Sequence, residues 1–319
     1  MKRMMAAVLL LCLALSLAAC RESDPVQESS DPLSIVTTVF PAYDFARQIA
    51  GERAKVSLLV PPGAESHSFE PTPQDMLRVQ ESSLFFCNGG ESEAWVEELL
   101  EGQDAPPETL CMLDCVDALE EEIKEGMQQI FEEEAEGEEG EEGPEYDEHV
   151  WTSPVKAMEI CRALCEDLCR IDPEGETLYR SNLAAYEAKL ADLDSAFRRA
   201  VAQGQREVLV FADRFPVRYF VEEYGLDYYA AFPGCADDTE PSARTVAFLI
   251  DRVREQRIPA VLTIEFSNEK MADVICEDTG CGKLRFHSCH TVSAEDLEQG
   301  VTYLDLMWQN VETVKEALG

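Results

Sequence analysis

The four histidines are the residues whose chemistry stands out in this chain. They are His67, His149, His287 and His290, and each lies where a loop or a strand end is expected rather than inside a helix. Imidazole nitrogen is a favoured ligand of Zn²⁺, and two or three imidazoles with a carboxylate make a tetrahedral site. Ca²⁺ or Mg²⁺ would instead require mostly oxygen ligands. The histidines therefore predict a binding site for a divalent transition metal.

A carboxylate is expected to complete this site. Asp213 directly follows an expected strand of the second half of the chain, and it is our first candidate for the fourth ligand. Glu240, Glu265, His290 and water remain alternatives for the same position. Asp213 could equally cap the next helix, and Glu265 could orient His287 without touching the metal.

An α/β fold must position these residues, because from Ser34 onward short β-branched runs alternate with amphipathic stretches. Strands are expected at residues 34–39, 55–60, 84–88, 109–114, 207–211, 260–265 and 283–286. Helices are expected at residues 42–49, 73–81, 93–100, 154–171, 174–202, 217–224, 242–256, 268–277 and 300–318. Ligands of open α/β sheets collect beyond the carboxyl ends of the strands. We therefore expect His67, His149 and His287 to meet in one cleft.

The order of these elements predicts two layered α/β lobes joined by a long, rigid helix, with the metal site in the cleft between the lobes. At about 1.5 Å per residue, a helix over residues 174–202 is long enough to bridge two lobes. The expected divisions are a signal peptide at 1–20, a tether at 21–33, a first lobe at 34–172, a connecting helix at 173–204 and a second lobe at 205–319.

The amino-terminal segment predicts export. Lys2 and Arg3 precede an apolar run that is too short to span a bilayer, as in a secretory signal peptide. The run ends in Leu-Ala-Ala-Cys20, which resembles a bacterial lipobox. We expect lipidation at Cys20 and a location on the outer face of the cell membrane, with an ordinary cleaved signal or an uncleaved anchor as alternatives.

Charge narrows the choice of partners. The chain has 26 Lys and Arg against 64 Asp and Glu, a net charge of -38, so its field repels nucleic-acid phosphates and attracts cations. Residues 119–148 hold 14 Glu and one Asp against a single Lys. We expect an acidic, disordered insert there, which could also act as a weak antenna for cations.

The cysteines do not form the close pairs of a zinc finger or an iron–sulfur protein. Ten of the twelve remain once Cys12 and Cys20 are assigned to the leader, and none is arranged as CxxC. Cys161, Cys165 and Cys169 recur every four residues, as on the buried face of a helix; an unusual metal or redox site is the alternative. A disulfide between Cys235 and Cys289 is left open.

Two segments resemble the metal-binding lipoproteins of zinc and manganese ABC importers, the ZnuA-like solute-binding family known as cluster A-I. They run from Val60 to Pro73, with the core Glu-Ser-His67-Ser-Phe-Glu-Pro, and from Asp147 to Pro154, with the sequence Asp-Glu-His149-Val-Trp-Thr-Ser-Pro. The resemblance extends over residues 35–318 apart from the acidic insert. It implies that His67 and His149 lie in the first two ligand loops of the family.

The second lobe departs from the family pattern. The third ligand usually follows the first strand of that lobe, where this chain has Ala212, which cannot coordinate a metal. The position of the family's carboxylate, at the end of the last core strand, matches His287. The resemblance thus implies a ligand set of His67, His149 and His287, with Asp213 as the fourth member. The acidic insert, often rich in histidine in zinc-binding relatives, has none here.

These expectations combine into one function. We expect a monomeric, extracytoplasmic protein that binds Zn²⁺ and delivers it to an ABC-type permease in the membrane, with no reaction and no nucleic-acid partner. Binding of Mn²⁺ is the alternative for the metal. Rival functions are an adhesin stabilised by its metal and a zinc hydrolase that uses Glu240 or Glu265 as its base. The chain has no HExxH spacing, which disfavours the hydrolase.

Overall fold

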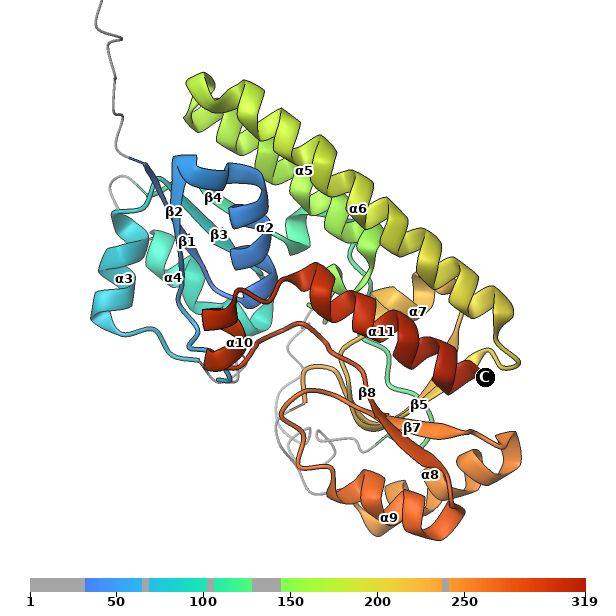
Figure 1. Cartoon of the computed structure of the whole chain (residues 1–319). Coiled ribbons are helices and arrows are strands. Elements are labelled where there is room, and N and C mark those ends of the chain that lie inside the picture. Colours follow the sequence, from blue (N-terminus) through green and yellow to red (C-terminus); the bar gives the residue numbers. More distant parts are fainter. Residues whose placement is uncertain (1–31, 65–68, 102–105, 128–144, 237–240) are drawn as a thin grey trace, which may run out of the picture. The chain divides into compact units, whose positions relative to one another are not determined.

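The computed structural model describes residues 32–64, 69–101, 106–127, 145–236 and 241–319. Leu33–Gly319 form one compact unit, which is distinct from Met1–Pro32. Figure 1 shows this unit as two parallel-sheet lobes with long helices packed beside them. The expected signal peptide, Cys20 and nearly all of the expected tether lie outside the described residues.

The first lobe is built on a parallel four-stranded sheet with the order β2-β1-β3-β4. Its strands are β1 (Leu33–Thr37), β2 (Ala54–Leu58), β3 (Leu84–Cys87) and β4 (Thr109–Cys111). Its helices are α2 (Phe40–Ala50), α3 (Pro73–Gln80) and α4 (Trp95–Glu101). The four strands and three helices expected from the sequence are thus present, with boundaries shifted by a few residues.

Local capping fixes where α3 begins. The backbone N–H of Asp75 donates to the Thr72 hydroxyl at 3.2 Å, and the backbone N–H of Thr72 donates to the Asp75 carboxylate at 2.9 Å. Pro73 occupies the first helical position, where no intrahelical N–H is needed. This reciprocal cap fixes Pro73 as the first residue of α3.

The second lobe has a parallel sheet with the order β6-β5-β7-β8. Its strands are β5 (Val208–Phe215), β6 (Asp227–Pro233), β7 (Ala260–Thr263) and β8 (Gly282–Arg285). Its helices are α7 (Arg218–Tyr224), α8 (Ala243–Gln256) and α9 (Lys270–Thr279). The short helix α10 (Ala294–Gln299) follows β8 in the sequence but lies beside the first lobe in Figure 1. Strand β6 and helix α10 were not expected from the sequence. After Asp227, β6 is a continuous apolar run at the edge of the sheet, without the alternation that marks a half-buried strand.

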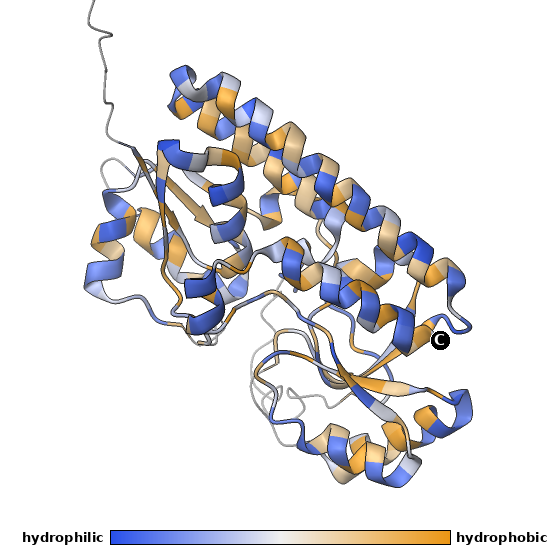
Figure 2. Ribbon diagram, viewed as in Figure 1, coloured by the Kyte–Doolittle hydropathy of each residue, from blue (hydrophilic) through white to orange (hydrophobic). Residues whose placement is uncertain are grey.

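Three long helices bind the two lobes together. They are α5 (Pro154–Ile171), α6 (Glu176–Gln203) and the carboxyl-terminal α11 (Tyr303–Leu318), and α6 packs against both α5 and α11. One hydrophobic core extends through both lobes and these helices. Figure 2 shows apolar residues along the strands and polar residues on outward turns of the helices. The connector α6 is therefore part of a shared core.

Two aspects of the cysteine analysis are resolved by the fold. Cys161 and Cys165 are fully buried on α5, and the half-buried Cys169 packs against the same core, so the helical-face interpretation is confirmed. Cys235 and Cys289 are free thiols, so the disulfide left open between them is not formed. Cys289 lies inside the main core, whereas Cys235 is only partly buried, beside Glu121.

The expectation of disorder over residues 119–148 is wrong for the ends of that segment. Glu120 and Tyr146 pair as an antiparallel bridge, and the Glu121 N–H donates to the Glu145 carbonyl at 2.9 Å. Met127 packs into the main core. Residues 128–144 lie outside the described part of the chain. The high negative charge of residues 119–148 predicted disorder throughout, but the residues near Glu120 and near Tyr146 pair as two short antiparallel segments, here called the stem.

This stem is attached to the second lobe. The Leu119 N–H donates to the Tyr219 hydroxyl at 3.0 Å, the Tyr228 hydroxyl donates to Glu122 at 3.2 Å, and Lys124 pairs with Asp227. Residues 119–124 of the stem are thereby held close to α7 and β6 of the second lobe. None of the helices in the described residues is both long enough and apolar enough to cross a bilayer.

Candidate metal-binding site

A cavity of about 490 Å³ opens beyond the carboxyl ends of β5, β7 and β8. The loops that follow these strands form most of its wall, and the segment that precedes α5 closes one side. This is the position at which open α/β sheets bind ligands. The titratable side chains of its wall are His149, Asp213, Arg214, Glu265, Lys270 and His290.

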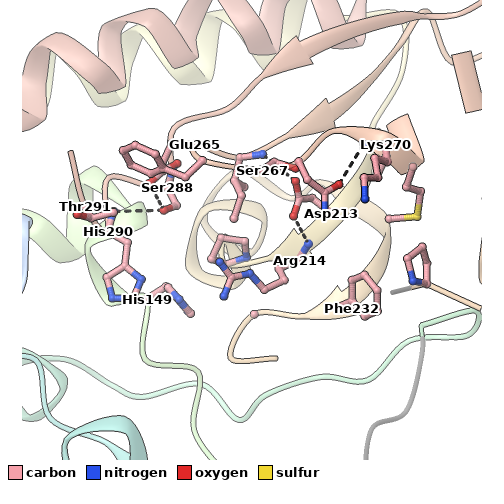
Figure 3. Close-up of a pocket in the computed structure, with 18 of the residues that line it drawn as sticks. His149, Asp213, Arg214, Phe232, Glu265, Ser267, Lys270, Ser288, His290 and Thr291 are labelled. Carbon is pink, nitrogen blue, oxygen red and sulfur yellow. Dashed lines mark hydrogen bonds between the residues drawn. The ribbon is translucent and has the colours of Figure 1, made fainter. Parts of the chain in front are cut away.

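Two imidazoles lie side by side in this cavity, one from each half of the chain. His149 precedes the short 3₁₀ turn that leads into α5, and His290 follows β8. Their ring centroids are 5.4 Å apart and their planes are nearly perpendicular, at 89°. Figure 3 shows both rings on the same side of the pocket. Because the two rings lie this close together, small rotations of the side chains can bring one nitrogen of each ring to the same metal ion.

Asp147 orients the His149 ring. Its Oδ1 atom lies 3.2 Å from Nδ1 of His149 and accepts the backbone N–H of His149 at 2.8 Å. A proton on Nδ1 that points at a carboxylate leaves the lone pair on Nε2, which is the atom that can bind a metal. The Tyr219 hydroxyl in turn donates to the Asp147 carbonyl at 2.9 Å. Asp147 belongs to the same sequence motif as His149, but no role was predicted for it.

Charge around His149 opposes the effect of its burial. Burial is the largest influence and by itself lowers the pKa of this imidazole, whereas Asp147 and then Glu148 raise it; the net result is a raised pKa. The side chain is only 1% exposed. A buried imidazole with carboxylate neighbours favours a cation at its ring, whether a proton or a metal ion.

The loop that carries His290 is held by Glu265 and Trp151. The Ser288 N–H donates to Glu265 at 2.7 Å and its hydroxyl donates at 2.5 Å, while the His290 N–H donates to the Ser288 hydroxyl at 3.2 Å. The indole N–H of Trp151 donates to the Ser288 carbonyl at 2.7 Å. Cys289 adopts a positive φ of 63°. These contacts fix the turn that aims residue 290 at the cavity.

Trp151 also contacts both imidazoles directly. Its ring centroid lies 5.5 Å from that of His149 and 5.2 Å from that of His290. Trp151 is fully buried. Nothing in the spacing of the sequence distinguished this tryptophan from an ordinary core residue, although it stands two positions after His149.

The structure places His287 away from the cavity in which the sequence predicted it. His287 does not line the cavity; its ring bonds to Gln309 of α11, and its backbone N–H and C=O pair with the Asn310 amide at 2.8 Å each. Burial lowers its pKa. Strand β8 ends at Arg285, and the turn at Cys289 then directs residue 290 to the side where residue 287 was expected.

Asp213 lines the cavity but is engaged elsewhere. Its carboxylate accepts the backbone N–H of Arg214 at 2.9 Å and that of Ile264 at 3.3 Å, which joins the ends of β5 and β7. Burial raises its pKa. Figure 3 shows it across the pocket from the two histidines, beside Lys270. In the structure the Asp213 carboxylate therefore links the end of β5 to the end of β7.

The remaining candidates divide by position. Ala212 is buried and lines the cavity without a donor atom, and Glu265 lines it with a carboxylate. His67 and Glu240 lie outside the described residues, although Gly63 and Ala64, which precede His67 in the sequence, line the cavity. Within the described ranges, no three His, Cys, Asp or Glu side chains converge closely enough to hold a metal ion. The described chain thus supplies two imidazoles and one nearby carboxylate.

Comparison with known proteins also points to a metal-binding protein. The family model described as zinc-uptake complex component A, periplasmic, matches residues 35–317. The chain is 30% identical over 311 residues to the high-affinity zinc uptake system protein ZnuA of Bacillus subtilis (strain 168), covering 95% of this chain and 94% of that protein. It is 27% identical to the manganese-binding lipoprotein MntA of Halalkalibacterium halodurans, covering 100% and 99% of the two chains.

A solved structure agrees with the fold. The Zn(II)-bound ZnuA-like domain of AdcA from Streptococcus pneumoniae superimposes with a TM-score of 0.74 at 27% identity, covering 90% of this chain and 99% of that domain. The family match spans both lobes and the helices between them. The chain therefore belongs to the family of zinc-uptake complex component A proteins.

Proposed function

We propose that this protein binds Zn²⁺ between its lobes and delivers it to an ABC-type importer. The observation that carries the proposal is the pair of imidazoles, His149 and His290, which lie side by side in the cavity wall with ring centroids 5.4 Å apart. Membership of the zinc-uptake family and the names of the relatives support the same cargo. The metal is the substrate here, because it is taken up and released.

Zinc is the favoured metal on chemical grounds. Imidazole nitrogens suit Zn²⁺, whereas Mn²⁺ prefers carboxylate, carbonyl and water oxygens and binds a given nitrogen site more weakly. The described part of the cavity wall offers both kinds of donor, with His149 and His290 beside Glu265. Mn²⁺ therefore remains the second candidate, as for the related MntA.

The proposed ligands follow from this placement. His149 and His290 bind the ion, Glu265 adds a carboxylate oxygen or holds the His290 loop, and Asp147 orients His149. His67 stays a ligand expected from the sequence, and Gly63 and Ala64, shortly before it in the chain, line the cavity.

The proposal includes a place in the cell. Lipidation at Cys20 would tether the protein to the outer face of the cell membrane, beside its permease, as the names of lipoprotein relatives suggest. We propose that it acts there as a monomer. Membrane fractionation of cells that express C20A tests the anchor, since the variant should appear in the soluble extracytoplasmic fraction.

No reaction is part of the proposed function. Both carboxylate oxygens of Glu265 accept hydrogen bonds from Ser288, so this residue is poorly placed to take a proton from a metal-bound water. The proposal is thus a binding protein rather than a zinc hydrolase, and assays of the zinc-loaded protein with ester, peptide and phosphate substrates test that choice.

Metal titration tests the central proposal. The purified mature protein is stripped with a chelator, and Zn²⁺ and Mn²⁺ are then titrated separately by calorimetry with a competing chelator of known affinity. We expect one equivalent of Zn²⁺ to bind, and more tightly than Mn²⁺. Absence of saturable one-to-one binding by either ion would overturn the proposed function.

A further inference from the structure

Two thiols outside the metal site lie next to each other in the second lobe. The Sγ atoms of Cys276 and Cys281 are 3.6 Å apart, whereas a disulfide requires about 2.05 Å. We propose that Cys276 and Cys281 form a redox-active pair that closes to a disulfide by exchange with an external disulfide. Neither cysteine lines the metal cavity, so the proposal stands apart from the metal site.

The backbone brings the two thiols together at a tight turn. Cys276 lies in the last turn of α9, which ends at Gly280, a glycine with a positive φ of 76°. The Gly280 N–H donates to the Cys276 carbonyl at 2.8 Å, and the chain then reverses into β8. Cys281 therefore stands beside the helix rather than in it. Rotation of the two short side chains about χ1 can close the remaining gap.

The pair Cys165 and Cys169 shows why this placement matters. These thiols also contact each other, but both lie inside α5, four residues apart. Cβ atoms at this helical spacing are about 5–6 Å apart, while a disulfide needs about 3.5–4.5 Å. Cys165 and Cys169 can touch without bonding, which makes them a built-in control.

An external disulfide can reach the proposed pair. Cys276 and Cys281 are both half-buried, unlike the fully buried Cys165. Burial, and then the neighbouring thiol of Cys281, raises the pKa of Cys276 to about 12. Because the thiolate is the nucleophile, a thiol of the pair must lose its proton before it attacks, and either one can do so first. Proteins outside the cytoplasm meet oxidants of this class.

The exchange balances in two steps. In one of the two possible orders, the Cys281 thiolate attacks one sulfur of oxidised glutathione, the S–S bond breaks, and one glutathione leaves as a thiolate that takes up a proton. Cys276, having lost its proton to solvent, then attacks the Cys281 sulfur and expels the second glutathione. The protein loses two protons and two electrons, and one molecule of oxidised glutathione becomes two thiols.

Peptide mapping tests the proposal on the whole folded protein. Reduced protein is freed of reductant, incubated with oxidised glutathione, quenched with acid, alkylated and digested with trypsin. Cleavage after Lys270 and Lys283 gives peptide 271–283, which contains Cys276 and Cys281 and no other cysteine. Cleavage after Arg162 and Arg170 gives peptide 163–170, which contains only the control pair.

The expected result is specific to one peptide. Peptide 271–283 should lose two hydrogens and carry no adduct, while peptide 163–170 should be recovered with both thiols alkylated. In C276S the second step is blocked, so glutathione should remain attached to Cys281. Retention of two free thiols in wild-type peptide 271–283, glutathione on both of its cysteines, or equal oxidation of both peptides would each overturn the proposal.

Discussion

The ring of His149 meets the ring of His290 edge to face, with centroids 5.4 Å apart, although the two residues come from opposite lobes. Trp151 touches both rings and bonds to the loop that carries His290. The position of the imidazole pair is therefore coupled to the core shared by both lobes. Substitutions at and around these residues can therefore distinguish side chains that bind the metal from side chains that only position its ligands.

His290 and His287 give a matched pair of substitutions. Loss of a residue that merely supports a ligand costs about 10–100-fold in metal affinity, so loss of the ligand itself in H290A should cost more than about 100-fold. H287A should change zinc affinity by less than about 10-fold, because His287 faces α11 and lies outside the cavity wall. Competition titration with a chelator measures both. A larger loss in H287A than in H290A would restore the original expectation for residue 287.

Asp147 should act through His149. Asn in place of Asp147 keeps an acceptor for the backbone N–H of His149 but removes the charge that favours a cation at its ring. We expect D147N to lower zinc affinity by about 10–100-fold. The control is E148Q. It removes the charge of an adjacent buried carboxylate, which accepts a hydrogen bond from the Ser92 N–H rather than from His149. Equal losses in the two variants would mean that charge alone matters, without any orientation of the ring.

Trp151 should stabilise the metal-free fold. Phe in its place removes the N–H that satisfies the Ser288 carbonyl and leaves a void in a fully buried site. We expect W151F to lower the free energy of unfolding by about 2–4 kcal/mol in chelator-treated protein, measured by urea denaturation. W308F, at a tryptophan that is 42% exposed, should change it by less than about 0.5 kcal/mol. Similar effects of both substitutions would contradict the proposed role of Trp151.

Glu93 should make stability depend on pH. It is 4% exposed, it accepts the backbone N–H groups of Asn88 and Gly89 at 2.8 Å each, and burial raises its pKa from 4.5 to about 7. Between these two values the folded protein binds more protons than the unfolded chain, so the free energy of unfolding falls as the pH rises. Gln at this position keeps an acceptor oxygen and does not titrate.

The measurement compares wild type with E93Q. Going from about pH 5 to about pH 8, wild type should lose on the order of 2 kcal/mol of stability relative to E93Q, as determined by urea denaturation at each pH. An identical difference at both pH values would show that Glu93 has an ordinary pKa in the folded protein.

Much of the fold could be predicted from the sequence, because its local signals agree with its packing. The cap at Thr72 and the four-residue spacing of Cys161 and Cys165 each identified a helix correctly. Strand β6 was missed because its residues after Asp227 are a continuous apolar run that shows no alternation. The stem at Glu120 and Tyr146 was missed because its pairing depends on partners in the second lobe.

The site could be predicted only in part. His149 lies just before the capped start of α5, and this local signal was enough to predict that it lies in a loop at the site. The choice between His287 and His290 depends on the turn at Cys289 and on the hydrogen bonds of Ser288 to Glu265. Such contacts join residues far apart in the sequence, and no spacing rule reveals them.

Anomalous scattering at the zinc absorption edge, from crystals of the zinc-loaded protein, tests the central claim most directly. We expect a single strong peak within about 2.0–2.1 Å of an imidazole nitrogen of both His149 and His290. A zinc ion bound through His287 without His290, or located away from the cavity altogether, would contradict the claim that these two imidazoles capture the metal.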